Sequence, residues 1–317
     1  MAGASMLNDV LKTCLDIKEG ETVLIVTDYN KMDIASRLEE AAKTLSNEVI
    51  MTKMKPRAHH AEEPPKAISE AMKGADVVII PTTMSLTHTD ASKNACEAGA
   101  RLASMPGITM QMLTRGGMSA DYDKVKEESE TIAKHLSRAE EIKIKTSLGS
   151  DFTADLKKRK GIADAGILDK KGMKGNLPGG EGFIAPLEGR PRGKLVFDGS
   201  FASLGLLKKP MILEIKNGLV TGVEGFRSQE LLKILEKYKN AENVAEIGIG
   251  TNSRATLIGN VLEDEKVYGT IHIAFGDNHT FGGAVKADVH LDGIITKPNV
   301  WLDDEKIIEE GEFLCFR

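Results

Sequence analysis

The chain has 317 residues, of which 41% are hydrophobic and 28% are charged, a composition typical of globular proteins with about two domains. Its formal net charge of −5 argues against nucleic acid or an anionic membrane as a partner, and its apolar runs are too short to span a bilayer. The N-terminus lacks the pattern of a signal peptide, and Cys14, Cys96 and Cys315 are not paired by spacing, so we expect a reduced, cytoplasmic protein.

The first half of the chain alternates short apolar runs with segments of helical spacing. The apolar runs predict strands at residues 22–27, 48–54, 76–81, 101–105 and 141–146. Apolar positions three and four residues apart predict helices at residues 31–45, 65–72, 89–98 and 122–138. We therefore expect an α/β domain over residues 1–147, with a parallel sheet and flanking helices. No glycine-rich phosphate-binding motif follows the first strand, so this domain is expected to be a scaffold or a lid.

The second half, residues 148–317, is rich in strand patterns and in glycine, and we expect an α+β domain there. A basic stretch at residues 147–174 predicts a solvated loop that connects the domains. Asn217-Gly218 between apolar flanks predicts a hairpin. Ser228 is the expected N-cap of a helix over residues 228–238.

Histidines and aspartates cluster in residues 270–295, which hold His272, His279 and His290. His290 and Asp292 are two residues apart in an apolar run, so they would point to the same face of a strand. His272 opens a second apolar run that a neighbouring strand could bring to the same point. Such nitrogen and oxygen ligands suit Zn²⁺, Mn²⁺, Co²⁺ or Fe²⁺, and two histidines with one carboxylate also describe a non-haem iron triad. The alternative is a set of hydrogen-bonded polar residues at strand ends.

Two glutamates stand in unusual surroundings. Glu181 is central in a loop with the sequence GNLPGGEGFIAP, where it could reach a metal or a substrate amine, or lie exposed at a hairpin tip. Glu246 interrupts an apolar strand, NVAEIGIGTN. Because a buried carboxylate without a partner is costly, a cation beside Glu246 is expected.

Together these segments resemble the aminopeptidase T family of metallo-aminopeptidases. The resemblance lies in the order and type of four motifs between Asn176 and Ile295, which read NLPGGEGFIAP, AEIGIG, HIAFG and HLDGII. It implies that the metal ligands are Glu181, Glu246, His272, His290 and Asp292. The family has a tyrosine seven residues after the first histidine of the site, where this chain has His279, and we expect His279 to bind metal or to donate a proton.

The resemblance further implies a metal-dependent aminopeptidase that releases N-terminal amino acids from peptides. Two divalent ions (Zn, Co, Mn or Mg) would activate a water molecule, with Glu246 as the bridging ligand and Glu181 as the group that transfers a proton. Family members are dimers, which makes a homodimer the expectation for this chain.

A related branch of the same fold, the 2,5-dihydroxypyridine dioxygenase type, gives a second hypothesis. That branch uses one Fe(II) held by two histidines and one aspartate, which would be His272, His290 and Asp292 here. The GDNHTFGG segment and the HLDG motif resemble it, and His279 would then act as an acid or base on a small aromatic substrate. A third hypothesis is a non-catalytic metal-binding relative that has kept the fold.

Overall fold

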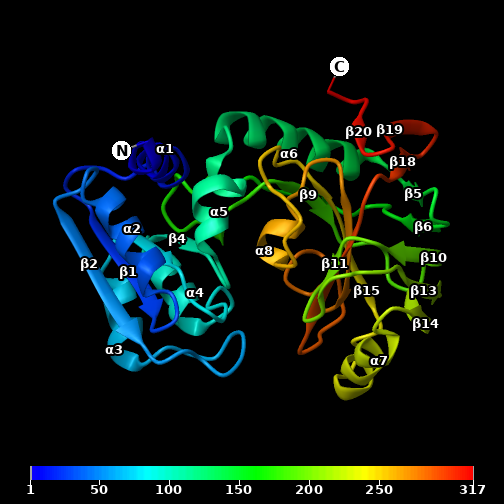
Figure 1. Ribbon diagram of the computed structural model, residues 1–317, viewed down its shortest axis with the longest axis horizontal. Coiled ribbons are helices and arrows are strands. Elements are labelled where there is room, and N and C mark those ends of the chain that lie inside the picture. Colours follow the sequence, from blue (N-terminus) through cyan, green and yellow to red (C-terminus); the bar gives the residue numbers. More distant parts are fainter. Residues whose placement is uncertain (1, 317) are drawn as a thin grey trace. The chain divides into compact units, whose positions relative to one another are not determined.

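Residues 2–316 are described by a computed structural model and fold into two compact units, which are treated separately below (Figure 1). The first unit comprises residues 1–126 and 166–179, and the second comprises residues 127–165 and 180–317. The domain boundary expected at residue 147 falls within the second unit, between the strands β5 (Glu141–Lys145) and β6 (Asp151–Asp155).

The first unit is built on a parallel sheet. Among the described residues its strand order is β2-β1-β3-β4-β8, and all neighbouring strands are parallel. The strands are β1 (Thr22–Asp28), β2 (Glu48–Met54), β3 (Val77–Ile80), β4 (Arg101–Ser104) and β8 (Lys174–Asn176). The helices are α1 (Ala2–Leu15), α2 (Met32–Ala42), α3 (Lys66–Lys73), α4 (Asp90–Glu97), α5 (Met110–Arg115) and the 3₁₀ helix η1 (Gly117–Ser119); α6 (Tyr122–Arg138) begins in this unit.

Both faces of this sheet are covered. Leu24 and Val78 belong to a buried cluster that also includes Ile68 of α3 and Ala91 of α4. Val23, which alternates with Leu24 along β1 and so points to the opposite face, is also fully buried. Burial on both faces is why β1 and β3 are continuous apolar runs. The expected α/β architecture is confirmed.

A partly buried ion pair anchors β4 to the segment before β1. Arg101 lies with its Nη1 atom 2.9 Å from Oε1 of Glu21 and its Nη2 atom 2.5 Å from Oε2. Burial alone would raise the pKa of Glu21, but the hydrogen bonds from Arg101 and from the backbone of Lys18 outweigh it and hold this pKa below its ordinary value. The pair therefore stabilises the fold above the unfolded-state pKa of about 4.3, and this stabilisation is lost as the pH falls through the lower folded-state pKa.

Arg101→Met is accordingly expected to lower the free energy of unfolding by about 2–3 kcal/mol near neutral pH, because it leaves the Glu21 carboxylate half-buried without its partner. Urea denaturation at several pH values measures this loss, which should shrink below about pH 4 as Glu21 becomes protonated. Lys93→Met, which removes an exposed ion pair with Glu97 in the same unit, is the control and should change stability by less than about 0.5 kcal/mol. A loss for Arg101→Met that does not vary with pH would assign the effect to packing instead of charge.

The second unit consists of two antiparallel sheets. Among the described residues, one sheet has the order β14-β13-β10-β6-β5-β18-β19-β20 and is called the β10 sheet here; the other, the β16 sheet, has the order β12-β11-β17-β16-β15-β9-β7. The further strands of the β10 sheet are β10 (Arg192–Phe197), β13 (Met211–Lys216), β14 (Leu219–Gly225), β18 (Asn299–Leu302), β19 (Glu305–Glu309) and β20 (Glu312–Phe313). The β16 sheet contains β7 (Ile162–Asp164), β9 (Glu181–Ile184), β11 (Ser200–Phe201), β12 (Gly205–Leu206), β15 (Val244–Gly250), β16 (Ile271–Gly276) and β17 (His290–Ile295). The helices α7 (Ser228–Lys237) and α8 (Val261–Asp264) complete this unit.

One hydrophobic core joins the two sheets of the second unit. Phe197 of the β10 sheet meets Phe201 and Phe275 of the β16 sheet, with ring centroids 5.3 Å and 6.1 Å away. The same core cluster includes Ile247 of β15 and Ile273 of β16. The β16 sheet therefore turns one face to this core, which leaves its opposite face for polar side chains.

Three local expectations have clear outcomes in the second unit. The hairpin at Asn217-Gly218 is confirmed, since both residues have positive φ and connect β13 to β14. The N-cap expected at Ser228 is wrong, because Arg227 holds that position with a left-handed backbone and no side-chain cap. The basic stretch at 147–174 is not merely a loop, because β6 and β7 lie within it.

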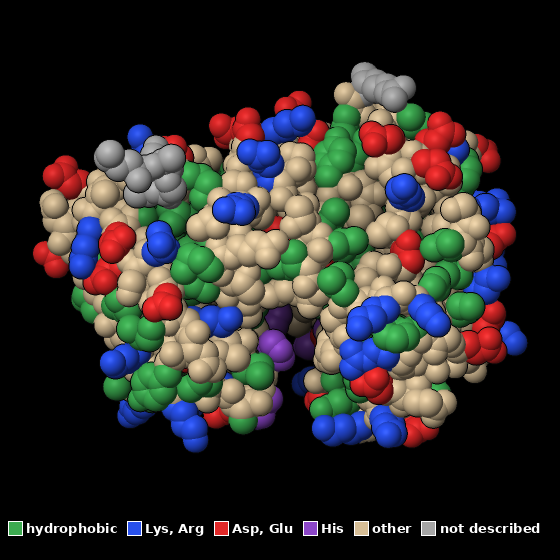
Figure 2. Space-filling model, viewed as in Figure 1, with side chains coloured by type: hydrophobic (Ala, Val, Ile, Leu, Met, Phe, Trp, Pro, Cys, Tyr) green, Lys and Arg blue, Asp and Glu red, His purple; other side chains and the backbone are tan. Residues whose placement is uncertain are grey.

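The surface carries a mixture of charges. On the face shown in Figure 2, lysine and arginine side chains are interspersed with aspartate and glutamate, in keeping with the small net charge. Among the described residues there is no helix with the length and apolar character that a membrane crossing would require.

Candidate metal centre

One face of the β16 sheet carries five of the residues singled out in the sequence: Glu181, Glu246, His272, His290 and Asp292. Strands β9, β15, β16 and β17 are adjacent in it. Residues that alternate along these strands, such as Ile273 and Leu291, enter the hydrophobic core. The residues between them, which include His272, His290 and Asp292, point to the opposite face. The prediction that His290 and Asp292 share a face of one strand is thus confirmed by the registry of β17.

A β-bulge brings Glu246 to this face. The register of β15 against β16 shifts between Val244 and Glu246, so that Val244 and Ile247 both lie in the core although they are three residues apart. In a regular strand Val244 and Glu246 would point the same way. The extra residue, Ala245, reverses the alternation and turns the Glu246 carboxylate away from the core.

Small residues beside the ligands leave room for their side chains. In the strand register Glu246 faces Ala274, which in turn faces Asp292, so only a methyl group separates the two carboxylates laterally. His272 faces Gly248 across β15 and β16. A Cβ atom at Gly248 would lie 1.9 Å from the Nε2 atom of His272, so the imidazole occupies space that any larger residue would fill.

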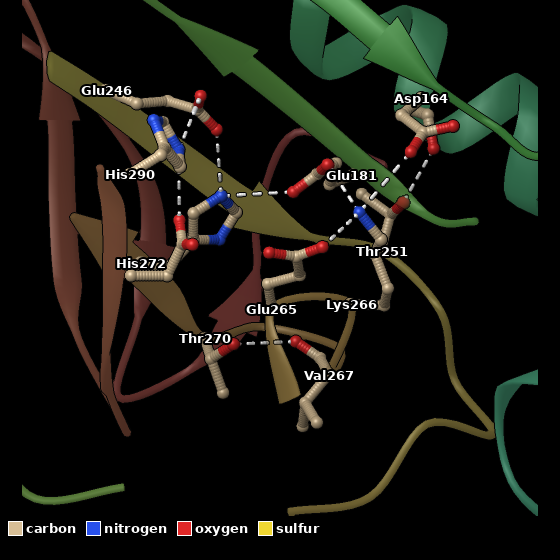
Figure 3. A network of polar contacts seen from close by, with 12 residues as sticks. Asp164, Glu181, Glu246, Thr251, Glu265, Lys266, Val267, Thr270, His272 and His290 are labelled. Atoms are coloured by element: carbon tan, nitrogen blue, oxygen red, sulfur yellow. Dashed lines mark hydrogen bonds and ion pairs between the residues drawn. The ribbon is translucent and has the colours of Figure 1, made fainter. Parts of the chain in front are cut away.

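Within the described residues the candidate ligand atoms form two clusters that share Glu246 (Figure 3). In the first, Nε2 of His272 lies 3.0 Å from Oε2 of Glu181 and 3.3 Å from Oε1 of Glu246. In the second, Nε2 of His290 lies 3.5 Å from Oε2 of Glu246 and 3.5 Å from Oδ1 of Asp292. The ligand atoms of each cluster lie within 4.8 Å of one another. Glu181 opens β9 and is buried, so it is not at an exposed hairpin tip.

Asp277 accepts hydrogen bonds from two histidines, His290 and His279. Its backbone carbonyl accepts a hydrogen bond of 2.9 Å from Nδ1 of His290, which leaves Nε2 to face Glu246 and Asp292. Its side chain accepts a hydrogen bond of 2.7 Å from Nδ1 of His279. His279 is 44% exposed at its side chain and lies outside both ligand clusters of the described residues, so the structure does not bring it together with the other predicted ligands.

A buried lysine that the sequence reading missed lies beside Glu181. Lys266 is fully buried, and its ammonium group contacts the carboxylates of Glu181, Glu265 and Asp164. Neither Lys266 nor Asp164 carries a local signal in the sequence, since Lys266 stands in an acidic stretch, EDEKVYG, that reads as a surface turn. The contact forms only when β7 pairs with β9 and the chain after α8 folds beside them.

The electrostatics of the site favour positive charge. Burial alone would lower the pKa of His272, but the carboxylates of Glu181 and Glu246 outweigh it and hold this pKa well above the ordinary value. Burial is likewise outweighed at His290, where Asp292 and Glu246 raise the pKa to about 10. Burial raises the pKa of Glu265 to about 8, opposed by Lys266 and assisted by Glu181. The site therefore attracts protons, and a divalent cation would compete with them for the same atoms.

The orphaned polar atoms of the site fit a metal ion. Oε2 of Glu181 is buried and has no hydrogen bond in the described part of the chain, although His272 is near it. A metal ion bound to both Nε2 of His272 and Oε2 of Glu181 would satisfy this oxygen. Imidazole nitrogens with carboxylate oxygens suit Fe²⁺, Zn²⁺ or Mn²⁺. The residues present thus fit a divalent metal.

Comparison with known proteins separates the remaining hypotheses. The sequence model of a family described as NicX, 2,5-dihydroxypyridine 5,6-dioxygenase, matches residues 4–315. The 2,5-dihydroxypyridine 5,6-dioxygenase of Pseudomonas putida is 27% identical over 267 residues, which are 78% of this chain and 74% of that protein. The solved structure of 2,5-dihydroxypyridine dioxygenase from Pseudomonas putida has a TM-score of 0.83 and 22% identity, and the match covers 98% of this chain and 96% of that one. Wild-type AmpT from Thermus thermophilus has a TM-score of 0.72 and 17% identity, with 98% of both chains covered. At these identities the two structural matches show a shared fold.

The family match contradicts the expected aminopeptidase activity. The predictions of a hydrolase, a protease and a metallo-aminopeptidase were wrong, and the dioxygenase alternative is the better supported one. The reason is structural: the motifs that suggested a peptidase describe ligand-bearing strands, and the same fold occurs both in AmpT and in a dioxygenase. Such motifs therefore do not distinguish the two chemistries.

Proposed function

Since this chain belongs to the 2,5-dihydroxypyridine 5,6-dioxygenase family, we propose that it opens the ring of a dihydroxylated pyridine with O₂ at a single Fe(II). The observation that carries the proposal is the family match over residues 4–315. His272, His290 and Asp292 would hold the metal, as two imidazoles and one carboxylate on adjacent strands. Both atoms of O₂ would enter the product as the carbon–carbon bond between ring positions 5 and 6 breaks.

The electron transfer that activates O₂ is the chemistry that Fe(II) supplies when bound, and the residues of the chain supply binding and proton transfer. Aromatic side chains support a planar substrate: Phe281 packs edge-on against the rings of His290 and Phe183, with centroids 5.8 Å and 5.6 Å apart. This aromatic wall lies beside the proposed ligand His290. A pyridine ring could pack against it with the hydroxyl groups directed toward the carboxylates.

His279 is the group best placed for proton transfer. The Asp277 carboxylate accepts its Nδ1 proton, which fixes the tautomer and leaves Nε2 as a base for a substrate hydroxyl group. The half-exposed position of His279 suits a group that exchanges protons with solvent between turnovers.

The proposal is tested by oxygen consumption with 2,5-dihydroxypyridine after anaerobic loading with Fe(II). We expect uptake of O₂ equal to the substrate consumed, and a product that carries two ¹⁸O atoms when ¹⁸O₂ is supplied. Removal of the metal with a chelator should abolish uptake, and renewed Fe(II) should restore it. Aminoacyl anilides with Zn²⁺ or Co²⁺ form the control reaction and should not be cleaved. A product labelled from water instead of O₂, or cleavage of the anilides, would refute the dioxygenase assignment.

A further inference from the structure

Lys266 places a permanent cation inside the carboxylate cluster. Its Nζ atom lies 2.5 Å from Oε1 of Glu181, 2.9 Å from Oε1 of Glu265 and 3.3 Å from Oδ2 of Asp164 (Figure 3). Three acceptors match the three hydrogens of an ammonium group. The same three carboxylates would otherwise form a typical oxygen-ligand set for a divalent ion.

The backbone holds the lysine firmly in this position. Its N–H group donates to the carbonyl of Glu263 at the end of α8, and its carbonyl accepts from the N–H group of Asn252. The Lys266 side chain is fully buried, and its ammonium group is enclosed by the carboxylates of Glu181, Glu265 and Asp164.

We propose that the Lys266 ammonium group takes the place of a second divalent cation beside Glu181 and thereby limits the centre to one metal ion. Glu181 is shared: its Oε1 atom binds Lys266, and its Oε2 atom faces His272. A second metal ion on Glu181 would have to displace the lysine or lie next to its charge in a buried site, where repulsion is weakly screened. The remaining ligands, His272, His290 and Asp292 with Glu246, are then available for a single ion.

This inference rests on the proposed function for the identity of the resident metal, but the number of ions bound can be counted without any turnover. The chain and its Lys266→Met variant are stripped of metal, saturated with Mn²⁺, freed of excess by gel filtration and analysed for elemental content. We expect about one ion per chain for the parent and about two for Lys266→Met. One ion in the variant, or none or two in the parent, would overturn the proposal.

Two further variants secure the interpretation. Lys306→Met removes a partly buried lysine that pairs with Glu309 in the β10 sheet, and it should leave the count at about one. If Lys266→Met does not fold, Lys266→Met/Glu265→Gln removes one of the carboxylates that would lose their partner and keeps Glu181 and Asp164 for the second ion. The double variant is also expected to bind about two ions, and one ion would count against the proposal.

A parent that binds one ion but does not open dihydroxypyridine would refute the proposed function while leaving the role of Lys266 intact.

Discussion

His290→Ala is expected to lose at least about 100-fold in metal affinity and, with it, the ring-opening activity. The variant removes an imidazole whose Nε2 atom faces both Glu246 and Asp292 and whose orientation is set by the carbonyl of Asp277. Without metal the variant should also lose stability, because the buried carboxylates of Glu246 and Asp292 lose the imidazole beside them. Elemental analysis after dialysis, with oxygen uptake on the same samples, measures the losses of metal and of activity.

His279→Ala is the matched control for this prediction. His279 lies in the loop that precedes β17 and is also hydrogen-bonded to Asp277, but it lies outside the ligand clusters of the described residues. We expect this variant to keep its metal and to show a lower kcat by about 100-fold or more, the range for loss of a general acid or base. Full metal content in His290→Ala would remove His290 from the ligand set, and loss of metal in His279→Ala would add His279 to it.

Gly248→Ala is expected to lower metal content and to reduce kcat by at least about 100-fold, although it adds only one methyl group. The new Cβ atom would lie 1.9 Å from Nε2 and 2.1 Å from Cε1 of His272, so the imidazole must leave its position. Overpacking of this kind typically destabilises a protein by about 1–3 kcal/mol, so most of the chain should remain folded. Metal content and thermal unfolding, measured on the same preparation, separate loss of the site from loss of the fold.

Gly222→Ala is the control for the glycine substitution. Gly222 also lies in a strand of the second unit, but a Cβ atom there would be 3.5 Å from its nearest neighbour, which is an ordinary contact. This variant should keep its metal and its activity. Equal effects of the two substitutions would show that loss of strand flexibility, not displacement of His272, accounts for the result.

The sequence predicted the parts of the site that depend on strand alternation. His290 and Asp292 are separated by one apolar residue, which suffices to place both on one face of a strand. The apolar run after Ile271 likewise identified the strand that carries His272. The parallel sheet of the first unit was predictable from a different pattern, since its buried strands are short apolar runs between helical segments.

Other features depend on contacts between segments that are distant in the chain. The bulge at Ala245 decides which way Glu246 points, and a bulge is visible only in the pairing of β15 with β16. Lys266 reads as a surface residue because its neighbours are acidic, and only the fold shows that Asp164 and Glu181 surround it. The prediction of the activity was wrong because the motifs identify the strands that carry the candidate ligands. These strands belong to the fold, which AmpT and the dioxygenase share, and they do not identify the substrate.

The order of the ligands along the chain also has a consequence for the lifetime of the protein. The proposed ligands Glu246, His272 and Asp292 come from β15, β16 and β17, so the chelating site exists only when these strands are paired. An unfolded chain offers the ion little more than an isolated His-x-Asp. An ion that binds only the native state stabilises it in proportion to the logarithm of the free ion concentration. With the proposed Fe(II) as the resident ion, iron scarcity would stop catalysis and also raise the fraction of opened chains exposed to proteases. The cellular amount of this protein would then follow the iron supply.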